Sequence, residues 1–196
     1  MSHPSRRELI HGVLAAGGVG LTGARSFAQE LAPTPQCDEH GSATRAQTEG
    51  PFFKPRSPDR AELAEPGAKA RIVELGGYLL TRNCNPMARA VVDLWHADEK
   101  GAYDNNGFRY RGHVYTDSKG RYRFRTIMPG LYSGRTRHYH IKVAAGGRVL
   151  LTTQLYFPDE PGNRRDGLFR PELLMRVSSA GNEMRALFDF VVDFKA

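Results

Sequence analysis

The sequence predicts an all-β protein, an antiparallel β-sandwich with long loops and little helix. The chain of 196 residues has the length of one domain, and its 21 glycines and 12 prolines favour turns. Several short segments rich in β-branched and aromatic residues follow one another, with turn residues between them. Many short strands at close spacing, with few helical patterns, are typical of β-sandwiches.

The first three predicted strands cover residues 72–80, 90–95 and 111–115. The first is rich in β-forming residues and ends before the turn signal Asn-Cys-Asn-Pro at residues 83–86. The second is dominated by apolar and β-branched residues. The third leads into Asp-Ser-Lys-Gly at residues 117–120, which we expect to close a hairpin.

Residues 122–127 alternate between aromatic and basic side chains over their first four positions, so we expect a strand with one buried face. The Pro-Gly pair at residues 129–130 ends this strand. Segments 138–144 and 149–157 are also rich in β-forming residues. They flank the Gly-Gly pair at residues 146–147, which predicts another hairpin.

The remaining segments complete the predicted domain organisation. Residues 168–176 could hold a short helix, and residues 187–194 are expected to form a final apolar strand. Residues 54–69 are rich in Pro, Arg and Glu and indicate a surface loop. Residues 29–47 predict an irregular arm, and we expect the β-sandwich domain to span residues 48–196.

Residues 1–28 are expected to be an export signal and not part of the fold. The pair Arg6-Arg7 precedes a modestly apolar, Gly-rich stretch at residues 9–24, and Ser-Phe-Ala at residues 26–28 is a candidate cleavage site. Paired arginines favour the twin-arginine route. A chance pair ahead of a Sec signal or a disordered tail is the alternative. We therefore expect an exported protein, periplasmic or extracellular.

The charge and hydropathy of the chain argue against two classes of partner. The formal net charge is +7, but the basic residues are scattered and no nucleic-acid-binding motif is present. No unbroken apolar window in the sequence is long enough to cross a bilayer. We therefore expect neither a nucleic-acid partner nor a stable membrane association.

The two cysteines of the chain are Cys37 and Cys84, and they form no metal-binding pattern. In an exported chain, a pair of cysteines is more often a disulfide than a reactive or metal site. We therefore expect a bridge that ties the N-terminal arm to the fold. Two free thiols are the alternative, because the sequence does not show whether the two positions meet bridging geometry.

The strongest chemical signal is His138-Tyr139-His140, within a predicted strand. Residues i and i+2 of a strand point to the same face, so the two imidazoles project side by side as a metal requires. Tyr132 lies six residues before His138, and Tyr103 lies further upstream. A phenol has a pKa of about 10, so only a strongly Lewis-acidic ion such as Fe(III) makes it a tyrosinate ligand at neutral pH. These residue types alone do not select two tyrosines out of eight.

A set of short motifs around these residues resembles the intradiol ring-cleavage dioxygenase family. The motifs follow the family's order over about residues 48–160. They are Thr48-Glu49-Gly50-Pro51-Phe52-Phe53, Asp93-Leu94-Trp95-His96-Ala97, Gly101-Ala102-Tyr103, residues 116–127 with Pro129-Gly130-Leu131-Tyr132, Arg135 with His138-Tyr139-His140, and residues 152–157.

The resemblance implies one mononuclear non-haem Fe(III) per chain, with Tyr103, Tyr132, His138 and His140 as protein ligands and a solvent hydroxide as the fifth ligand. It implies that the substrates are a catechol-type diol and O₂. Cleavage between the two hydroxylated carbons would give a cis,cis-muconate-type product.

The resemblance also implies roles for other residues. Arg135 would stabilise developing negative charge, Gln154 would lie beside the site, and Tyr132 would leave the metal and accept a substrate proton. The segment of Gly50, Pro51 and Phe52 would wall the substrate pocket. The sequence departs from the family pattern at Arg137, a second cation beside His138, so it leaves open which arginine faces the site.

Two other readings remain open at this point. One is a cupin-like Fe(II) or Zn(II) enzyme that uses the two histidines and a carboxylate. The other is an exported, non-catalytic β-sandwich that binds ligands. The sequence identifies neither the preferred catechol nor the oligomeric state, and it does not fix the signal cleavage point.

Overall fold

The computed structural model describes residue 37 and residues 41–194. The export signal expected at residues 1–28 lies outside the described residues, as does most of the arm at residues 29–47. In the described part of the chain, no helix is long and apolar enough to cross a membrane.

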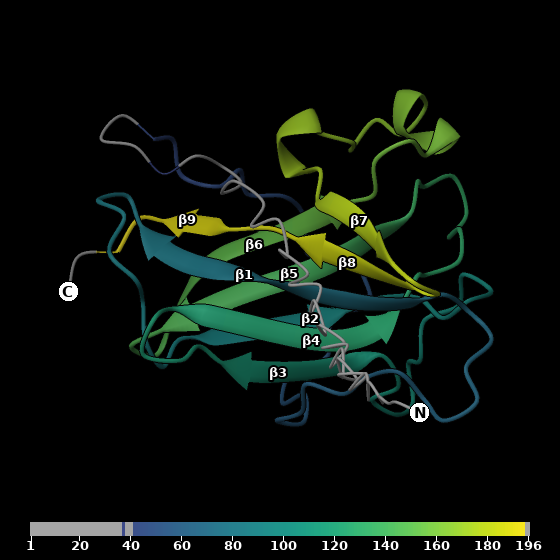
Figure 1. Ribbon diagram of the computed structural model, residues 1–196, viewed down its shortest axis with the longest axis horizontal. Helices are drawn as coiled ribbons and strands as arrows, with labels where there is room; N and C mark the ends of the chain where they lie inside the picture. Colours follow the sequence, from purple (N-terminus) through teal and green to yellow (C-terminus); the bar gives the residue numbers. More distant parts are fainter. Residues whose placement is uncertain (1–36, 38–40, 195–196) are drawn as a thin grey trace, which may run out of the picture. The chain divides into compact units, whose positions relative to one another are not determined.

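The described residues form two β-sheets and only two short 3₁₀ turns, so the predicted all-β class is confirmed (Figure 1). One sheet has the strand order β3-β2-β5-β6, and the other has the order β4-β1-β8-β7 with β9 also paired to β1. The first sheet is antiparallel throughout, whereas β1 pairs in parallel with β8 and β9. The elements are β1 (Ile72–Thr81), β2 (Val91–Trp95), β3 (Arg111–Tyr115), β4 (Arg121–Ile127), β5 (His138–Ala145), β6 (Arg148–Tyr156), η1 (Pro161–Arg164), η2 (Pro171–Leu173), β7 (Arg176–Ala180), β8 (Glu183–Leu187) and β9 (Phe190–Val192).

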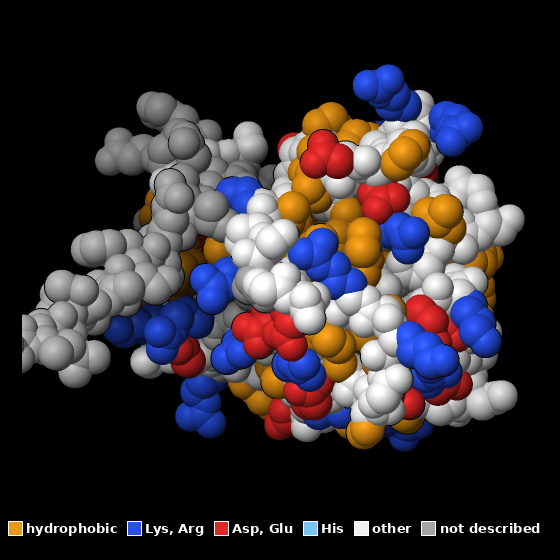
Figure 2. Space-filling view, turned by 45° about the vertical axis from the view of Figure 1, so that its right-hand side comes forward, with side chains coloured by type: hydrophobic (Ala, Val, Ile, Leu, Met, Phe, Trp, Pro, Cys, Tyr) orange, Lys and Arg blue, Asp and Glu red, His pale blue; other side chains and the backbone are white. Residues whose placement is uncertain are grey.

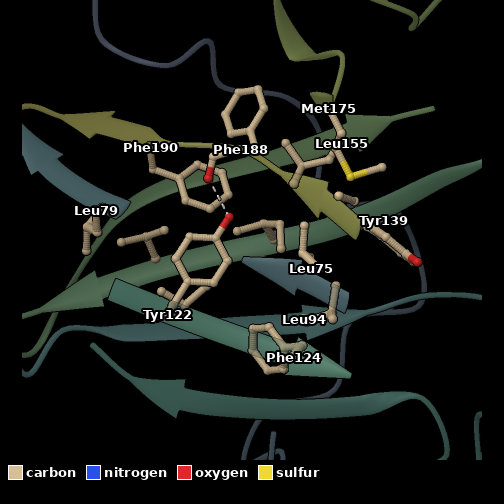
Figure 3. Close-up of a cluster of buried hydrophobic side chains, with 14 of the residues drawn as sticks. Leu75, Leu79, Leu94, Tyr122, Phe124, Tyr139, Leu155, Met175, Phe188 and Phe190 are labelled. Carbon is tan, nitrogen blue, oxygen red and sulfur yellow. Dashed lines mark hydrogen bonds between the residues drawn. The ribbon is translucent and has the colours of Figure 1, made fainter. Parts of the chain in front are cut away.

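The core lies between the two sheets, as the alternating patterns predict (Figure 3). In β4, Tyr122 and Phe124 are buried while Arg121 and Arg123 are exposed. The Tyr122 hydroxyl donates a hydrogen bond to the carbonyl of Phe188 at 2.7 Å, so this polar atom is satisfied inside the core. Each large apolar side chain buried here contributes roughly 1.5–3 kcal/mol to folding.

The turn at residues 117–120 is present, but the prediction that it closes a hairpin is wrong. The Asp117 carboxylate accepts hydrogen bonds from the backbone amides of Lys119 and Arg121 at 2.8 and 2.9 Å. The strands on either side belong to different sheets, because β3 pairs with β2 and β4 pairs with β1. The turn residues specify a chain reversal, whereas the burial of Tyr122 and Phe124 specifies the sheet that β4 joins.

The C-terminal region also differs from its prediction. The expected strand at residues 187–194 is divided into the end of β8 and the short β9. The possible helix at residues 168–176 is reduced to the turn η2, and β7 begins at Arg176. The side chain of Asp189, between β8 and β9, accepts a hydrogen bond from the backbone amide of Tyr78 at 2.8 Å, which interrupts the regular ladder along β1.

Charged side chains cover the surface in mixed order. On the face that Figure 2 shows, Lys and Arg side chains lie among Asp and Glu side chains and do not form one continuous patch. Several of the surface arginines form ion pairs, including Arg123 with Glu74 at 2.6 Å and Arg125 with Glu183 at 2.8 Å. Exposed pairs of this kind contribute little to stability, about 0–1 kcal/mol each.

Cys37 and Cys84 form a disulfide across a sequence separation of 47 residues. Closing a loop of this length removes conformational entropy from the unfolded chain. We expect the Cys37→Ser/Cys84→Ser double variant to lose about 2–4 kcal/mol of unfolding free energy. Urea unfolding of both proteins, with and without reductant, measures this loss. Reductant should shift only the unsubstituted protein, and equal midpoints for all samples would contradict the expectation.

Candidate metal centre

The candidate centre lies on the outer face of the four-stranded sheet, because β5 alternates between the two sides. Tyr139 and Ile141 point into the core, so His138 and His140 point to the opposite face. In the sheet register, His140 has Trp95 of β2 on one side and Gln154 of β6 on the other. The hydrogen-bonding pattern of three strands therefore aligns one aromatic, one imidazole and one amide side chain.

Three donor atoms converge at this face. The Tyr103 hydroxyl lies 2.9 Å from His140 Nε2 and 3.3 Å from His138 Nε2, and the two Nε2 atoms are 3.2 Å apart. Two ligands about 2 Å from one ion and at right angles to each other are about 3 Å apart, so this triangle fits a metal ion. Among the residues that the structure describes, no group of three or more His, Cys, Asp or Glu side chains could hold a metal.

Both histidines are prepared to act as neutral ligands. The Nδ1 atom of His138 lies 2.7 Å from the carbonyl oxygen of Thr136, to which it can donate its proton, and this leaves the Nε2 lone pair free. Burial lowers the pKa of His138 to about 4 and holds the pKa of His140 well below its usual value. The His140 ring stacks on the indole of Trp95 at a centroid distance of 5.0 Å, which fixes its plane.

The Tyr103 phenol is buried, so positive neighbours are needed for it to ionise. Burial raises the pKa of the Tyr103 phenol, while Arg135 and Arg111 lower it. An ion bound at the triangle would add the positive charge that a phenolate needs. The Tyr103 ring also stacks on Phe52 at a centroid distance of 4.4 Å, so its position is fixed from one side.

Tyr132 lies beside the triangle on a second loop. Its ring meets the ring of Tyr103 edge-on at 5.6 Å and the ring of Phe52 edge-on at 5.4 Å. The two tyrosine loops cross in close backbone contact at Gly101 and Gly130. A Cβ atom on Gly101 would lie 2.1 Å from the carbonyl oxygen of Leu131, and one on Gly130 would lie 2.4 Å from the amide nitrogen of Gly101. Only glycine permits this approach.

Arg135, and not Arg137, joins the network next to the triangle. The Arg135 guanidinium donates to Asp166 at 2.8 Å and to the Gln154 side-chain oxygen at 2.7 Å. Arg137 instead donates to the carbonyl of Pro129 and pairs with Glu160 at 3.1 Å. Of the two arginines, Arg135 is thus the one that bonds to Gln154, the sheet neighbour of His140.

The segment around Phe52 closes one side of the centre. A Cβ atom on Gly50 would lie 3.2 Å from the His140 ring, so glycine lets the backbone approach the imidazole. Pro51 is exposed at the surface. Arg111, which is 1% exposed, donates to the carbonyl of Phe52 at 2.6 Å and ties the segment to β3. Arg111 could not be identified as part of the centre from the sequence, because an arginine in a short strand gives no sign that it is buried.

The centre and the fold can be compared with known proteins. The family model described as "Dioxygenase" matches residues 48–193. A chlorocatechol 1,2-dioxygenase from a Pseudomonas species is 29% identical over 180 residues, which cover 76% of this chain and 70% of that protein. A catechol 1,2-dioxygenase from Acinetobacter baylyi is 28% identical over 151 residues, and the match spans 61% of this chain but only 48% of that protein.

Two solved structures are also similar. The dioxygenase domain of a dioxygenase–carbohydrate-binding protein fusion from the cellulolytic bacterium Streptomyces sp. SirexAA-E is 49% identical, with a TM-score of 0.76. This match covers 79% of the present chain and 100% of that one. The 3-chlorocatechol 1,2-dioxygenase from Rhodococcus opacus has a TM-score of 0.72 at 24% identity, covers 79% of this chain and 74% of that one, and shares the fold.

Proposed function

We propose that this chain, which belongs to the intradiol ring-cleavage dioxygenase family, cleaves catechol-type diols between their two hydroxylated carbons. Both atoms of O₂ would enter a cis,cis-muconate-type product. The observation that carries the proposal is the convergence of Tyr103, His138 and His140 within 3.3 Å of one another, with the ring of Tyr132 alongside.

The residues present fit one ferric ion per chain. We assign Tyr103, Tyr132, His138 and His140 as its protein ligands, because two phenols and two neutral imidazoles form a donor set suited to Fe(III). When bound, the ion supplies Lewis acidity that polarises both diol oxygens and activates the ring toward O₂.

The side chains around the ion manage protons and charge. We assign the phenolate oxygen of Tyr132 as the acceptor of one diol proton, which would leave Tyr132 as a neutral phenol; Tyr132 is half-buried on a loop at the edge of the centre. The Arg135 guanidinium would stabilise negative charge that develops on the substrate oxygens, and a fixed cation is most effective where water is scarce. Gln154 keeps Arg135 in place through the 2.7 Å hydrogen bond.

The aromatic side chains would orient the diol and limit water. Phe52 lies against Tyr103 and Tyr132, and Trp95 covers the His140 ring. Phe52 is only partly buried, and its flat apolar ring suits contact with an aromatic substrate. Gly50 and Pro51 lie next to Phe52 on the same side of the centre. A side chain at position 50 would press on the His140 ring.

We also propose that the enzyme acts outside the cytoplasm on aromatic compounds from the environment. The support is the Arg6-Arg7 pair with the apolar stretch that follows it, together with the Cys37–Cys84 disulfide. A strong kinetic preference for a diol that occurs only as an intracellular pathway intermediate would contradict this proposal.

Oxygen uptake by the iron-loaded protein tests the activity. We expect uptake with a panel of catechols, and ¹⁸O₂ should place two labelled atoms in a muconate-type product detected by mass spectrometry. We also expect a red to burgundy colour, since Fe(III)–tyrosinate sites absorb visible light. A colourless protein that still cleaves catechols would contradict the assignment of an Fe(III)–tyrosinate site. No uptake at full iron loading would favour a protein that only binds ligands.

A further inference from the structure

The connection that follows β6 carries a buried carboxylate, Asp166, which the proposed chemistry does not use. The Asp166 side chain is only 2% exposed. The turn η1 precedes it and packs closely on Thr136, because a Cβ atom on Gly162 would lie 3.0 Å from the Thr136 hydroxyl oxygen. The connection is therefore seated directly against the segment that leads into β5.

Asp166 contacts the segment before β5 at two points. One carboxylate oxygen accepts hydrogen bonds from Arg135 Nε at 2.8 Å and from the backbone amide of Thr136 at 2.9 Å. The other oxygen accepts a hydrogen bond from the backbone amide of Leu168 at 2.9 Å, a contact within the connection itself. Burial opposes ionisation of Asp166, but hydrogen bonds from Leu168, Thr136 and Arg135 bring its pKa below the usual value. The pair with Arg135 is therefore ionic.

Both contacts lead into the candidate centre. Arg135 extends from Asp166 to Gln154, which is the sheet neighbour of His140. The amide of Thr136 donates a hydrogen bond to Asp166, and the carbonyl oxygen of the same residue lies 2.7 Å from Nδ1 of His138. A proton on Nδ1, donated to this carbonyl, leaves the lone pair of Nε2 free toward the centre.

We propose that Asp166 is a positioning residue of the dioxygenase, which holds the Arg135 guanidinium and the His138 ring in one fixed arrangement. The inference rests on the proposed function, because it assigns Asp166 to the support of that same site. A buried carboxylate that pairs with a partly buried arginine gives that cation a single orientation. Asp166 also accepts a hydrogen bond from the amide of Thr136, the residue whose carbonyl oxygen meets Nδ1 of His138.

The test uses Asp166→Ala and Asp166→Asn in the full chain. Asp159→Asn, which changes an exposed carboxylate of the same connection, is the matched control. We expect kcat of the iron-loaded protein to fall by about 10–100-fold in Asp166→Ala, as for other residues that orient metal ligands, with little change in KM. Asp166→Asn should retain more activity than Asp166→Ala, because an amide oxygen can still accept the Thr136 amide.

A second readout does not depend on iron. Nitrogen-15 NMR of the metal-free chain reports the Nε signal of Arg135 and the ring nitrogens of His138. We expect Asp166→Ala to shift the Arg135 signal and to mix the two neutral forms of the His138 ring, while Asp159→Asn leaves both unchanged. If Asp166→Ala does not fold, Asp166→Asn carries the test, because it keeps the size of the side chain.

The outcomes separate the two proposals. Unchanged signals from Arg135 and His138 in a folded Asp166 variant would overturn the positioning role. An equal fall of kcat in Asp159→Asn would also overturn it, because the effect would then belong to the connection as a whole. Failure of the unsubstituted protein to consume oxygen would contradict the proposed function, while the NMR comparison would still measure whether Asp166 positions these side chains.

Discussion

The variant His140→Ala is expected to lose its iron, its colour and its oxygen uptake together. His140 provides one of the three converging donors and also fills the space against the Trp95 indole. Residues that merely orient a ligand contribute about 10–100-fold to metal affinity, so loss of a ligand should cost at least about 100-fold. Iron content by elemental analysis and the visible spectrum after reconstitution measure this loss.

The matched control for this variant is His113→Ala. His113 belongs to β3, and its Nδ1 atom forms a hydrogen bond with the Ser57 hydroxyl at 3.1 Å, away from the three donors. It should load iron as the unsubstituted protein does. If His140→Ala retained stoichiometric iron with an unchanged spectrum, His140 would not be a ligand and the donor set proposed above would be wrong.

Replacing Arg135 by glutamine should reduce kcat by about 10²–10³-fold while iron still binds. The expected loss corresponds to about 2.7–4 kcal/mol of transition-state stabilisation, the range found when one donor to a developing oxyanion is removed. Glutamine keeps a hydrogen-bonding group but removes the positive charge next to Gln154 and Asp166. Steady-state oxygen uptake at equal iron content measures the effect.

Arg137→Gln provides the control, since it removes the same charge two residues away. Arg137 pairs with Glu160 and with the carbonyl of Pro129. We therefore expect its kcat to remain close to that of the unsubstituted protein. If the two variants lost activity equally, the general positive potential, and not the position of Arg135, would be responsible.

The parts of the fold that depend on local alternation could be predicted from the sequence. The pattern at residues 122–127 predicts the buried face of β4. The spacing of His138 and His140 predicts two imidazoles on one face, and in the structure their Nε2 atoms are 3.2 Å apart. Side-chain period in a strand is a local property, so a short window is enough to identify it.

Long-range pairing could not be predicted in the same way. The turn at residues 117–120 has the residues of a hairpin, yet the chain crosses there from one sheet to the other. The sequence alone likewise does not select Tyr103 and Tyr132, because the crossing at Gly101 and Gly130 brings their loops together. Arg111 and Asp166 read as ordinary surface charges until tertiary packing buries them.

The crossing at Gly101 and Gly130 has a consequence for how such a site can diverge. Since there is no room for a methyl group at either glycine, a bulkier residue at position 101 or 130 would push the two loops apart and displace both phenols. Few substitutions that alter substrate preference can therefore be accommodated at this crossing. Changes in substrate preference are more readily accommodated in the segment around Phe52, which stacks on Tyr103 but takes no part in that crossing.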